Sequence, residues 1–135
     1  KEIQQRFESV VKRFDLSDYL DEKPSVLSGG FKQRLMLART LMHQPELIIF
    51  DEPTVGLDPH VRRQLWDLIL QLRKEDVTII LTTHYLEEAE LLSDRVCILE
   101  RGKVRLIDKP SNLKKLYDRK TLEDVFMRLM QEEAQ

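Results

Sequence analysis

Two short segments of the chain carry residue types that could handle a phosphate group. Residues 27–34 read Leu-Ser-Gly-Gly-Phe-Lys-Gln-Arg, and an apolar run that begins at Leu47 ends in Asp51-Glu52. A serine followed by two glycines at the start of a helix leaves the first backbone N–H groups uncovered. These groups, with the positive end of the helix dipole, suit a phosphate oxygen. Taken alone, Ser28-Gly29-Gly30 could equally be an ordinary helix cap and turn.

The acidic pair Asp51-Glu52 is expected at the carboxyl end of a buried parallel strand, where open α/β sheets place their ligands. A carboxylate at this edge can hold Mg²⁺, usually through water. The neighbouring Glu52 could orient and deprotonate an attacking water, as phosphoryl transfer to water requires. The plainer alternative is that the pair only ends the strand in solvent.

Two further polar residues could join this chemistry. His84 follows the next predicted strand, so in a parallel sheet it would emerge at the same edge as Asp51 and Glu52. Its imidazole could bond a terminal phosphate or the water, although a lone histidine at a strand end is more often structural. Asp58 follows Gly56, which permits a tight turn. Its default role is to cap the helix that starts at Pro59, and a second role across an interface is the alternative.

Helices alternate with short apolar strands along most of the chain, which predicts an α/β fold. Apolar spacing predicts a helix over residues 2–14, and a second helix after Ser28 that stops before Pro45. Strands are expected at residues 47–50 and 77–81, each buried on both faces. A helix from Pro59 joins them into a right-handed βαβ unit.

The remaining sequence predicts a hairpin between short helices. A helix at residues 86–92 precedes a strand at 96–99, a tight turn at Arg101-Gly102 and a return strand at 104–107. Ser111 is expected to cap a short helix, and the Thr121–Asp124 segment to open the last one. Cys97 is the only cysteine, and we expect it to be a small buried hydrophobe.

Composition excludes some classes of partner. The 135 residues include 22 Lys and Arg against 24 Asp and Glu, for a net charge of −2. No basic field therefore indicates nucleic acid as a partner. The longest apolar runs are far too short to cross a bilayer.

In their order and spacing, four segments resemble the motifs of the ATP-binding subunit of ABC transporters. Residues 27–34 are similar to the signature motif, and residues 47–52 to Walker B with its adjoining glutamate. Residues 55–58 are similar to the D-loop, and Thr83-His84 to the H-loop switch. Residues 84–99 and 121–126 are most similar to the export-type branch of the family.

The resemblance implies a partial RecA-like P-loop NTPase core, with parallel strands and flanking helices. Residues 1–45 would be a helical subdomain that carries the signature motif. Residues 46–109 would be the C-terminal part of the core, with Walker B, D-loop and H-loop. Residues 110–135 would be a helical tail.

The resemblance also implies a role for each candidate residue. Glu52 would be the general base, His84 would contact the γ-phosphate, and Asp51 would bind Mg²⁺. Two subunits would pair head to tail around two ATP molecules, and Asp58 would connect the two sites. The signature residues would contact the nucleotide of the opposite subunit: Ser28, Gly29, Gly30 and Gln33. A transmembrane permease partner would hold the subunit on the cytoplasmic face of a membrane.

One part of the family pattern has no counterpart in these 135 residues. None of the four glycines starts a G-x-x-x-x-G-K-[ST] loop, which normally wraps the phosphates of the nucleotide. In this family the Walker A loop, the adenine-stacking aromatic residue and the Q-loop glutamine precede the signature. We therefore expect a C-terminal portion that is inactive alone, with ATP and Mg²⁺ bound only by the complete subunit or with a partner chain. An apolar sheet edge should be left exposed.

Two other interpretations stay open at this point. The chain could be a non-catalytic binding piece that lends its signature motif to ATP held by a partner chain. It could also belong to a soluble ABC-type ATPase of translation or chromosome maintenance. Long coiled coils, a tandem second cassette or a basic arm would favour that class, and none is visible in this sequence.

Overall fold

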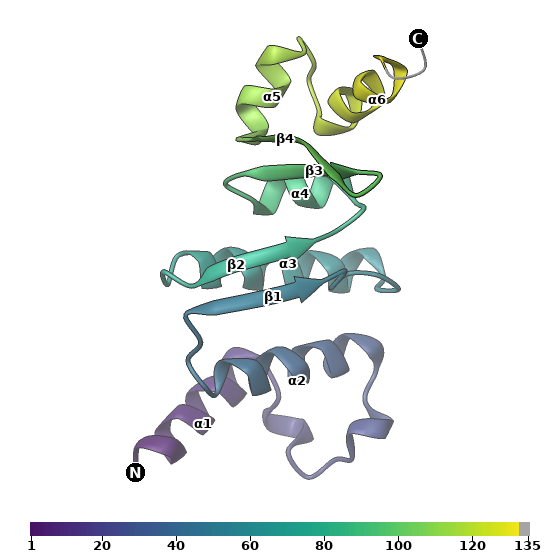
Figure 1. Cartoon of the computed structure of the whole chain (residues 1–135). Helices are drawn as coiled ribbons and strands as arrows, with labels where there is room; N and C mark the ends of the chain where they lie inside the picture. The colour runs from purple at the N-terminus through teal and green to yellow at the C-terminus, as the bar shows by residue number, and fades with distance from the viewer. Residues whose placement is uncertain (133–135) are drawn as a thin grey trace. The chain divides into compact units, whose positions relative to one another are not determined.

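The computed structural model describes residues 1–132, and the chain divides between Ile80 and Leu81 into two compact units (Figure 1). This division follows packing and does not test the three segments that the motifs suggest, which remain predictions. The last three positions of the expected tail, 133–135, lie outside the described residues. Among the residues described, no helix is long and apolar enough to cross a bilayer.

The first unit combines helices with the first strands. In chain order its elements are α1 (Glu2–Arg13), the 3₁₀ turns η1 (Ser17–Tyr19) and η2 (Pro24–Val26), α2 (Gly29–Leu41), β1 (Leu47–Asp51) and α3 (Pro59–Arg73). The strand β2 (Thr78–Thr82) begins in this unit and ends just past its boundary. The helices and strands predicted in this stretch are therefore present.

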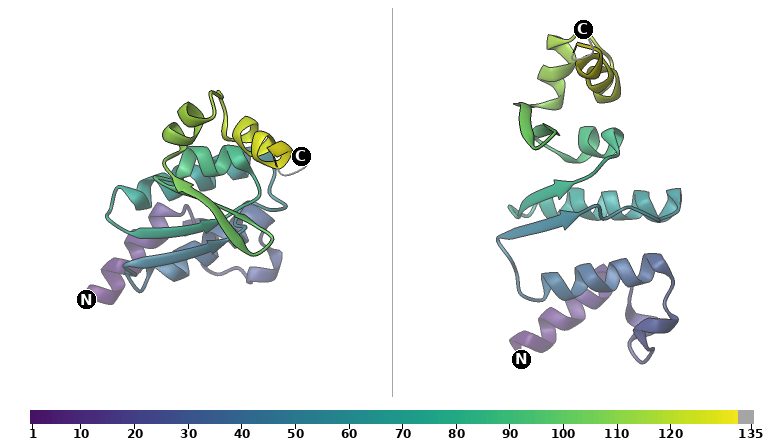
Figure 2. Two further views of the ribbon diagram at one scale, coloured as in Figure 1. Left: turned by 45° about the horizontal axis from the view of Figure 1, so that its top comes forward. Right: turned by 45° about the vertical axis from the view of Figure 1, so that its right-hand side comes forward.

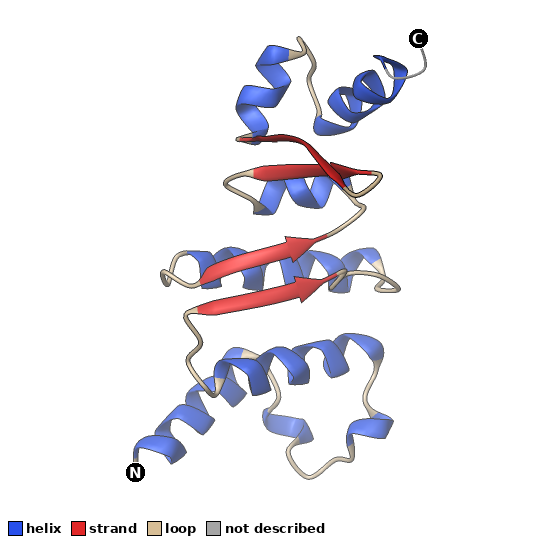
Figure 3. Ribbon diagram, viewed as in Figure 1, coloured by secondary structure: helices blue, strands red, loops and turns tan. Residues whose placement is uncertain are grey.

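Strands β1 and β2 pair with each other, and their arrows run the same way (Figure 3). Helix α3 connects them, which is the βαβ arrangement predicted, and the α/β class is confirmed. The expectation that these strands are buried on both faces is wrong. In β1, Ile48 and Phe50 are buried while Leu47 and Ile49 are exposed, and Ile80 of β2 is also exposed. Within residues 1–132 these strands pair only with each other, and the exposed apolar residues show that one face of the pair has no cover.

Helix α3 begins and packs as its sequence predicts. Asp58 is its N-cap and Pro59 is its first helical residue. Apolar spacing predicts a buried stripe of Val61, Leu65, Leu68, Ile69 and Leu72; Leu65, Ile69 and Leu72 are buried, whereas Val61 and Leu68 are only partly buried. Trp66, which the apolar spacing missed, is also only 6% exposed.

The second unit is built on a β-hairpin (Figure 2). Its elements are α4 (Leu86–Leu92), β3 (Val96–Glu100), β4 (Lys103–Asp108), α5 (Pro110–Leu116) and α6 (Leu122–Glu132). Strands β3 and β4 are antiparallel, with Glu100 opposite Lys103. Arg101 and Gly102 between them both have positive φ, at 47° and 76°. Two such residues make the type I′ turn that suits a twisted hairpin, so the predicted turn is confirmed.

The hairpin packs one face against helices. Its buried residues Val96 and Ile98 form a core with residues of α5 and α6, namely Leu113, Leu122, Val125 and Leu129. Because side chains alternate along a strand, Cys97 and Leu99 lie on the opposite face. Cys97 is exposed there, so the prediction that it is buried is wrong.

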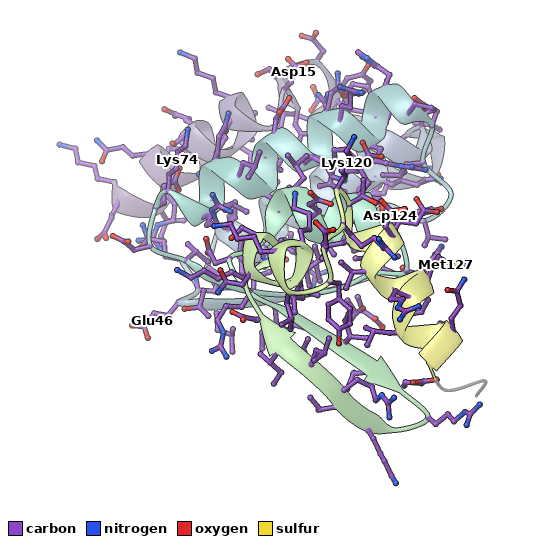
Figure 4. The ribbon with its side chains drawn as sticks, turned by 90° about the horizontal axis from the view of Figure 1, so that it is seen from above. Asp15, Glu46, Lys74, Lys120, Asp124 and Met127 are labelled. Carbon is purple, nitrogen blue, oxygen red and sulfur yellow. The ribbon has the colours of Figure 1, made fainter. Side chains whose placement is uncertain are left out.

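The starts of the last two helices differ in how well the sequence predicted them. Helix α5 begins at Pro110 rather than after Ser111, so Ser111 is not its cap. Proline suits the first helical position because that position needs no N–H donor. Thr121 does cap α6: its Oγ1 accepts from the backbone N–H of Asp124 at 3.1 Å. Asp124 lies at the start of that helix, with Met127 further along (Figure 4).

Candidate functional site

The predicted anion-binding turn opens α2 in the first unit. Ser28 is the N-cap in an extended conformation, and its Oγ accepts a long 3.4 Å hydrogen bond from the N–H of Phe31. Ser28 and Gly29 are exposed. Within the described part of the chain, the N–H groups of Gly29 and Gly30 have no hydrogen-bond acceptor. The helix start therefore presents free donors to solvent, as a phosphate site requires.

The two glycines of this turn have different surroundings. A Cβ built on Gly29 would meet no atom within 4 Å. A Cβ on Gly30 would come within 2.8 Å of Cγ1 of Val61, which lies in the first turn of α3. The turn is thus open to an incoming group at Gly29, whereas Gly30 is covered by the chain itself.

Several contacts hold the beginning of α2. The Phe31 ring lies 4.3 Å from the Tyr19 ring, centroid to centroid, and the Arg34 guanidinium lies over the Phe31 ring at 5.2 Å from its centroid. Arg34 also pairs with Asp15 at 3.4 Å. Its second terminal nitrogen donates to Oε1 of Gln64 on α3. Arg34 therefore connects the signature helix to two neighbouring segments.

Asp51 and Glu52 lie at the carboxyl end of β1, as the sequence predicts. Asp51 is exposed and Glu52 is partly buried. Glu52 has a φ of 48°, in the left-handed region that non-glycine residues rarely adopt. Backbone strain of this kind costs roughly 1–3 kcal/mol and gathers at functional sites.

The other non-glycine residues with left-handed φ in the described chain have ordinary explanations. Asp15, Gln44, Asp76 and Asp118 follow the ends of helices, and Arg101 lies in the hairpin turn. Glu52 instead follows a strand directly, before a loop that turns at Gly56, with φ of 75°. The strain at Glu52 is thus not a consequence of capping a helix or closing a hairpin.

Asp58 has the default role that the sequence predicts. Its Oδ1 accepts from the N–H groups of His60 at 3.0 Å and Val61 at 3.1 Å, so it caps α3. The exposed side of the carboxylate is still accessible. Capping therefore does not test the second role across an interface, which remains a prediction.

His84 belongs to the second unit and lies in the turn between β2 and α4. It is exposed, and its ring lies 4.2 Å from the ring of Tyr85, centroid to centroid. The turn is fixed by Oγ1 of Thr83, which accepts from the N–H of Tyr85 at 3.0 Å. The expectation that His84 shares a sheet edge with Asp51 and Glu52 stays a prediction.

Within the first unit, the signature turn and the helix after the D-loop come together. A cavity of about 270 Å³ lies beside them. Residues of both motifs line it, including Gly30, Gln33, Leu57 and Val61. Asp51 and Glu52 are not among the residues that line this cavity.

The residues present fit a nucleotide and Mg²⁺ unevenly. The open N–H donors at Gly29 suit a phosphate oxygen. Among the described residues, no group of three or more His, Cys, Asp or Glu side chains could hold a metal ion. Mg²⁺ is commonly held by one or two carboxylates together with water and phosphates. Asp51 could therefore supply one of its ligands, but not a complete site.

Comparisons with known proteins agree with these motifs. A family model described as ABC transporter matches residues 2–55. The chain is 48% identical over 103 residues to a Nod factor export ATP-binding protein I from Rhizobium meliloti, a match that covers 76% of the chain. It is 42% identical to ABC transporter G family member 20 from Dictyostelium discoideum over 92% of the chain. The chain belongs to the ABC transporter ATP-binding family.

Solved structures of this ABC family share the fold. One, described as an ATP binding subunit of an ABC transporter, matches 96% of the chain with a TM-score of 0.80 at 27% identity. Another is cbiO1 from Clostridium perfringens, described as part of the ABC transporter complex cbiONQ, with a TM-score of 0.77 at 32% identity. The match covers 55% of the first structure and 51% of the second. A partial RecA-like core is thereby shown.

The chain spans 31% of the Rhizobium relative and 17% of the Dictyostelium relative. The ABC family model includes the signature turn and the acidic pair but ends before Asp58 and His84. Sequence reasoning missed Val61, Arg34 and Gln64 as neighbours of the signature turn. Arg34 is the last residue of the signature octapeptide, so a local signal existed for that residue. None existed for Val61 and Gln64, because contacts between helices distant in sequence leave no local pattern.

Proposed function

We propose that the protein containing this chain is an ABC-type ATPase that couples ATP binding and hydrolysis to export of a substrate across a membrane. The observation that carries the proposal is the Ser-Gly-Gly start of α2, which presents free N–H donors to solvent. Such a turn binds anions in general. Membership of a family of ATP-binding subunits makes a nucleotide phosphate the expected anion.

Each candidate residue has a role in this proposal. Glu52 accepts a proton from the attacking water, and its carboxylate is held at a strand end by a strained backbone. Asp51 is the ligand that would hold Mg²⁺, which supplies charge stabilisation for phosphoryl transfer. His84 would bond the terminal phosphate. Geometry supports Glu52 most directly, because its left-handed φ belongs neither to a helix end nor to a hairpin turn but to the start of a loop turn, in which its carbonyl accepts from the N–H of Val55 at 3.3 Å.

The partners follow from the open signature turn. Ser28, Gly29, Gly30 and Gln33 would contact ATP held by a second ATP-binding subunit in a head-to-tail dimer, with Asp58 near the boundary. A transmembrane permease would hold this dimer on the cytoplasmic face of a membrane. Relatives named for Nod factor export support the export direction, whereas no feature of these residues specifies the exported substrate.

The test is Glu52→Gln in the full-length protein with its permease. This change keeps the size of the side chain but removes the base, so hydrolysis should fall at least about 100-fold. Binding of ATP should persist. Phosphate release measures hydrolysis, and equilibrium binding of a fluorescent ATP analogue measures ATP binding.

Glu46→Gln is the matched control, because Glu46 is an exposed acid just before the same strand β1. It should leave both hydrolysis and binding unchanged. Hydrolysis at the wild-type rate in Glu52→Gln would remove Glu52 from the role of general base. Loss of ATP binding in that variant would show that Glu52 serves nucleotide binding instead.

A further inference from the structure

Gly30 is required by a contact inside this chain. A Cβ at Gly30 would lie 2.8 Å from Cγ1, 3.1 Å from Cγ2 and 3.5 Å from Cβ of Val61. Val61 is short and branched, so it cannot swing out of the way as the end of a long side chain could. The neighbouring Gly29 faces open space. The two signature glycines are therefore needed for different reasons.

Val61 also contacts the D-loop through its backbone. Its N–H donates to Oδ1 of Asp58 at 3.1 Å, as part of the cap of α3. One residue thus touches both motifs, with its side chain on the signature turn and its amide on the D-loop cap. The neighbouring His60 amide donates to the same Oδ1, but the His60 ring bonds Gln64.

A second link joins the same two helices one turn further on. Arg34 of α2 donates to Gln64 of α3. Residues 30 and 34 lie on one face of α2, and residues 61 and 64 on one face of α3, because side chains three and four apart are neighbours on a helix. The two links form one row of contact between the helices. All four of these residues line the 270 Å³ cavity.

We infer that Val61 is a positioning residue that sets the place of the signature turn relative to the D-loop. This inference rests on the proposed function, in which the signature turn acts on ATP held by the opposite subunit. A shift of the turn should then slow turnover more than it weakens ATP binding, because other parts of the partner subunit hold most of the nucleotide. The expected result is a lower kcat with little change in KM.

The test is a double-mutant cycle in the full-length protein. Gly30→Ala should lower Tm by roughly 3–8 °C and kcat about tenfold, because the added methyl overlaps Val61. Val61→Ala alone should lower both by less. The double variant Gly30→Ala/Val61→Ala should recover both Tm and kcat above the values for Gly30→Ala. If Gly30→Ala alone does not fold, the Tm and kcat of the double variant are compared with those of Val61→Ala. The two variants should then be alike, because the methyl at residue 30 no longer meets the Val61 side chain.

Gly29→Ala is the matched control for stability. It adds the same methyl one residue earlier, in open space, so Tm should stay unchanged or rise, and Val61→Ala should not alter its effect. Failure of Val61→Ala to restore Tm would overturn the Gly30–Val61 contact. Recovery of Tm without recovery of kcat would overturn the positioning role of Val61, because the methyl would then slow turnover at Gly30 itself, which the proposed function places against ATP. Absence of ATP hydrolysis in the wild-type protein would contradict the proposed function, while the Tm cycle would still test the contact.

Discussion

The loop after β1 contains two residues whose local environments lower stability. Glu52 has a left-handed backbone, and the side chain of Thr54 is fully buried. Within the described part of the chain, Oγ1 of Thr54 has no hydrogen-bond partner. Burying an unbonded hydroxyl costs roughly 1–3 kcal/mol in proteins. Two such costs within three residues indicate that the loop is shaped by something other than stability.

Thr54→Val should raise the free energy of unfolding by about 1 kcal/mol, because it replaces the buried hydroxyl with a methyl of similar size. Denaturant unfolding of the full-length protein measures this change. Thr78→Val is the matched control, since Thr78 is exposed and should change stability by less than about 0.5 kcal/mol. A clear loss of stability in Thr54→Val would mean that the hydroxyl has a partner, such as a bound water.

The sequence predicted the elements better than their surroundings. Apolar spacing located α1 and α3, and Arg101-Gly102 located the hairpin turn, because these signals are local. Burial of Cys97 was predicted wrongly, since an apolar run does not show whether one face or both will be covered. Ser111 is a residue type that often caps helices, but Pro110 already starts α5. The contact of Gly30 with Val61 joins residues 31 positions apart, so no local pattern could indicate it.

Two substitutions of Asp58 can separate its role as the cap of α3 from a role in ATP hydrolysis. Asp58→Ala should destabilise the protein by about 1 kcal/mol, because α3 loses the acceptor for two N–H groups. Asp58→Asn keeps an oxygen that can accept these bonds, so stability should be nearly unchanged. If Asp58→Asn nevertheless slows ATP hydrolysis, its charge has a function beyond the cap. Thermal unfolding and phosphate release measure the two effects, and equal hydrolysis in wild type and Asp58→Asn would leave only the cap.

Glu90 connects three helices of the second unit and should make that unit sensitive to acid. From α4, it pairs with Lys114 of α5 and accepts from the N–H of Leu122 at the start of α6 at 2.9 Å. Partial burial raises the pKa of Glu90, but the bonds from Lys114 and Leu122 and the Lys114 charge lower it more. The net result is a pKa below the usual value. A lowered folded pKa stabilises the folded state above the unfolded pKa of about 4.3, and this stability is lost as pH falls through the folded pKa.

Glu90→Gln should therefore destabilise the protein at pH 7 and make little difference near pH 2.5. Urea unfolding at both values measures the change. Glu87→Gln, at an exposed position on the same helix, is the control and should have a small effect at either pH. An effect of Glu90→Gln that is equal at the two pH values would show that size or hydrogen bonding matters at this position, and charge does not.

Considered as a whole, the described chain has two small sheets, each with an uncovered apolar face. One face exposes Leu47, Ile49 and Ile80. The hairpin exposes Cys97, Leu99, Val104 and Ile107, and its register places Cys97 opposite Ile107 and Leu99 opposite Val104. Two-stranded sheets are marginally stable alone, and exposed apolar faces associate. The ABC structures that match are nearly twice as long as the matched region, so they contain further chain that this polypeptide does not.

The isolated 135-residue polypeptide should therefore self-associate through these faces. Ile49→Thr and Leu99→Thr each place a threonine, which strands favour, on one exposed face and make that face more polar. Both changes should shift sedimentation velocity profiles toward the monomer. Met127→Thr is the matched control, because Met127 is 53% exposed on helix α6 and belongs to neither sheet (Figure 4). It should leave association unchanged. Equal association in all three variants would place the contact elsewhere, and a monomeric wild-type polypeptide would show that these faces do not associate at the concentrations used.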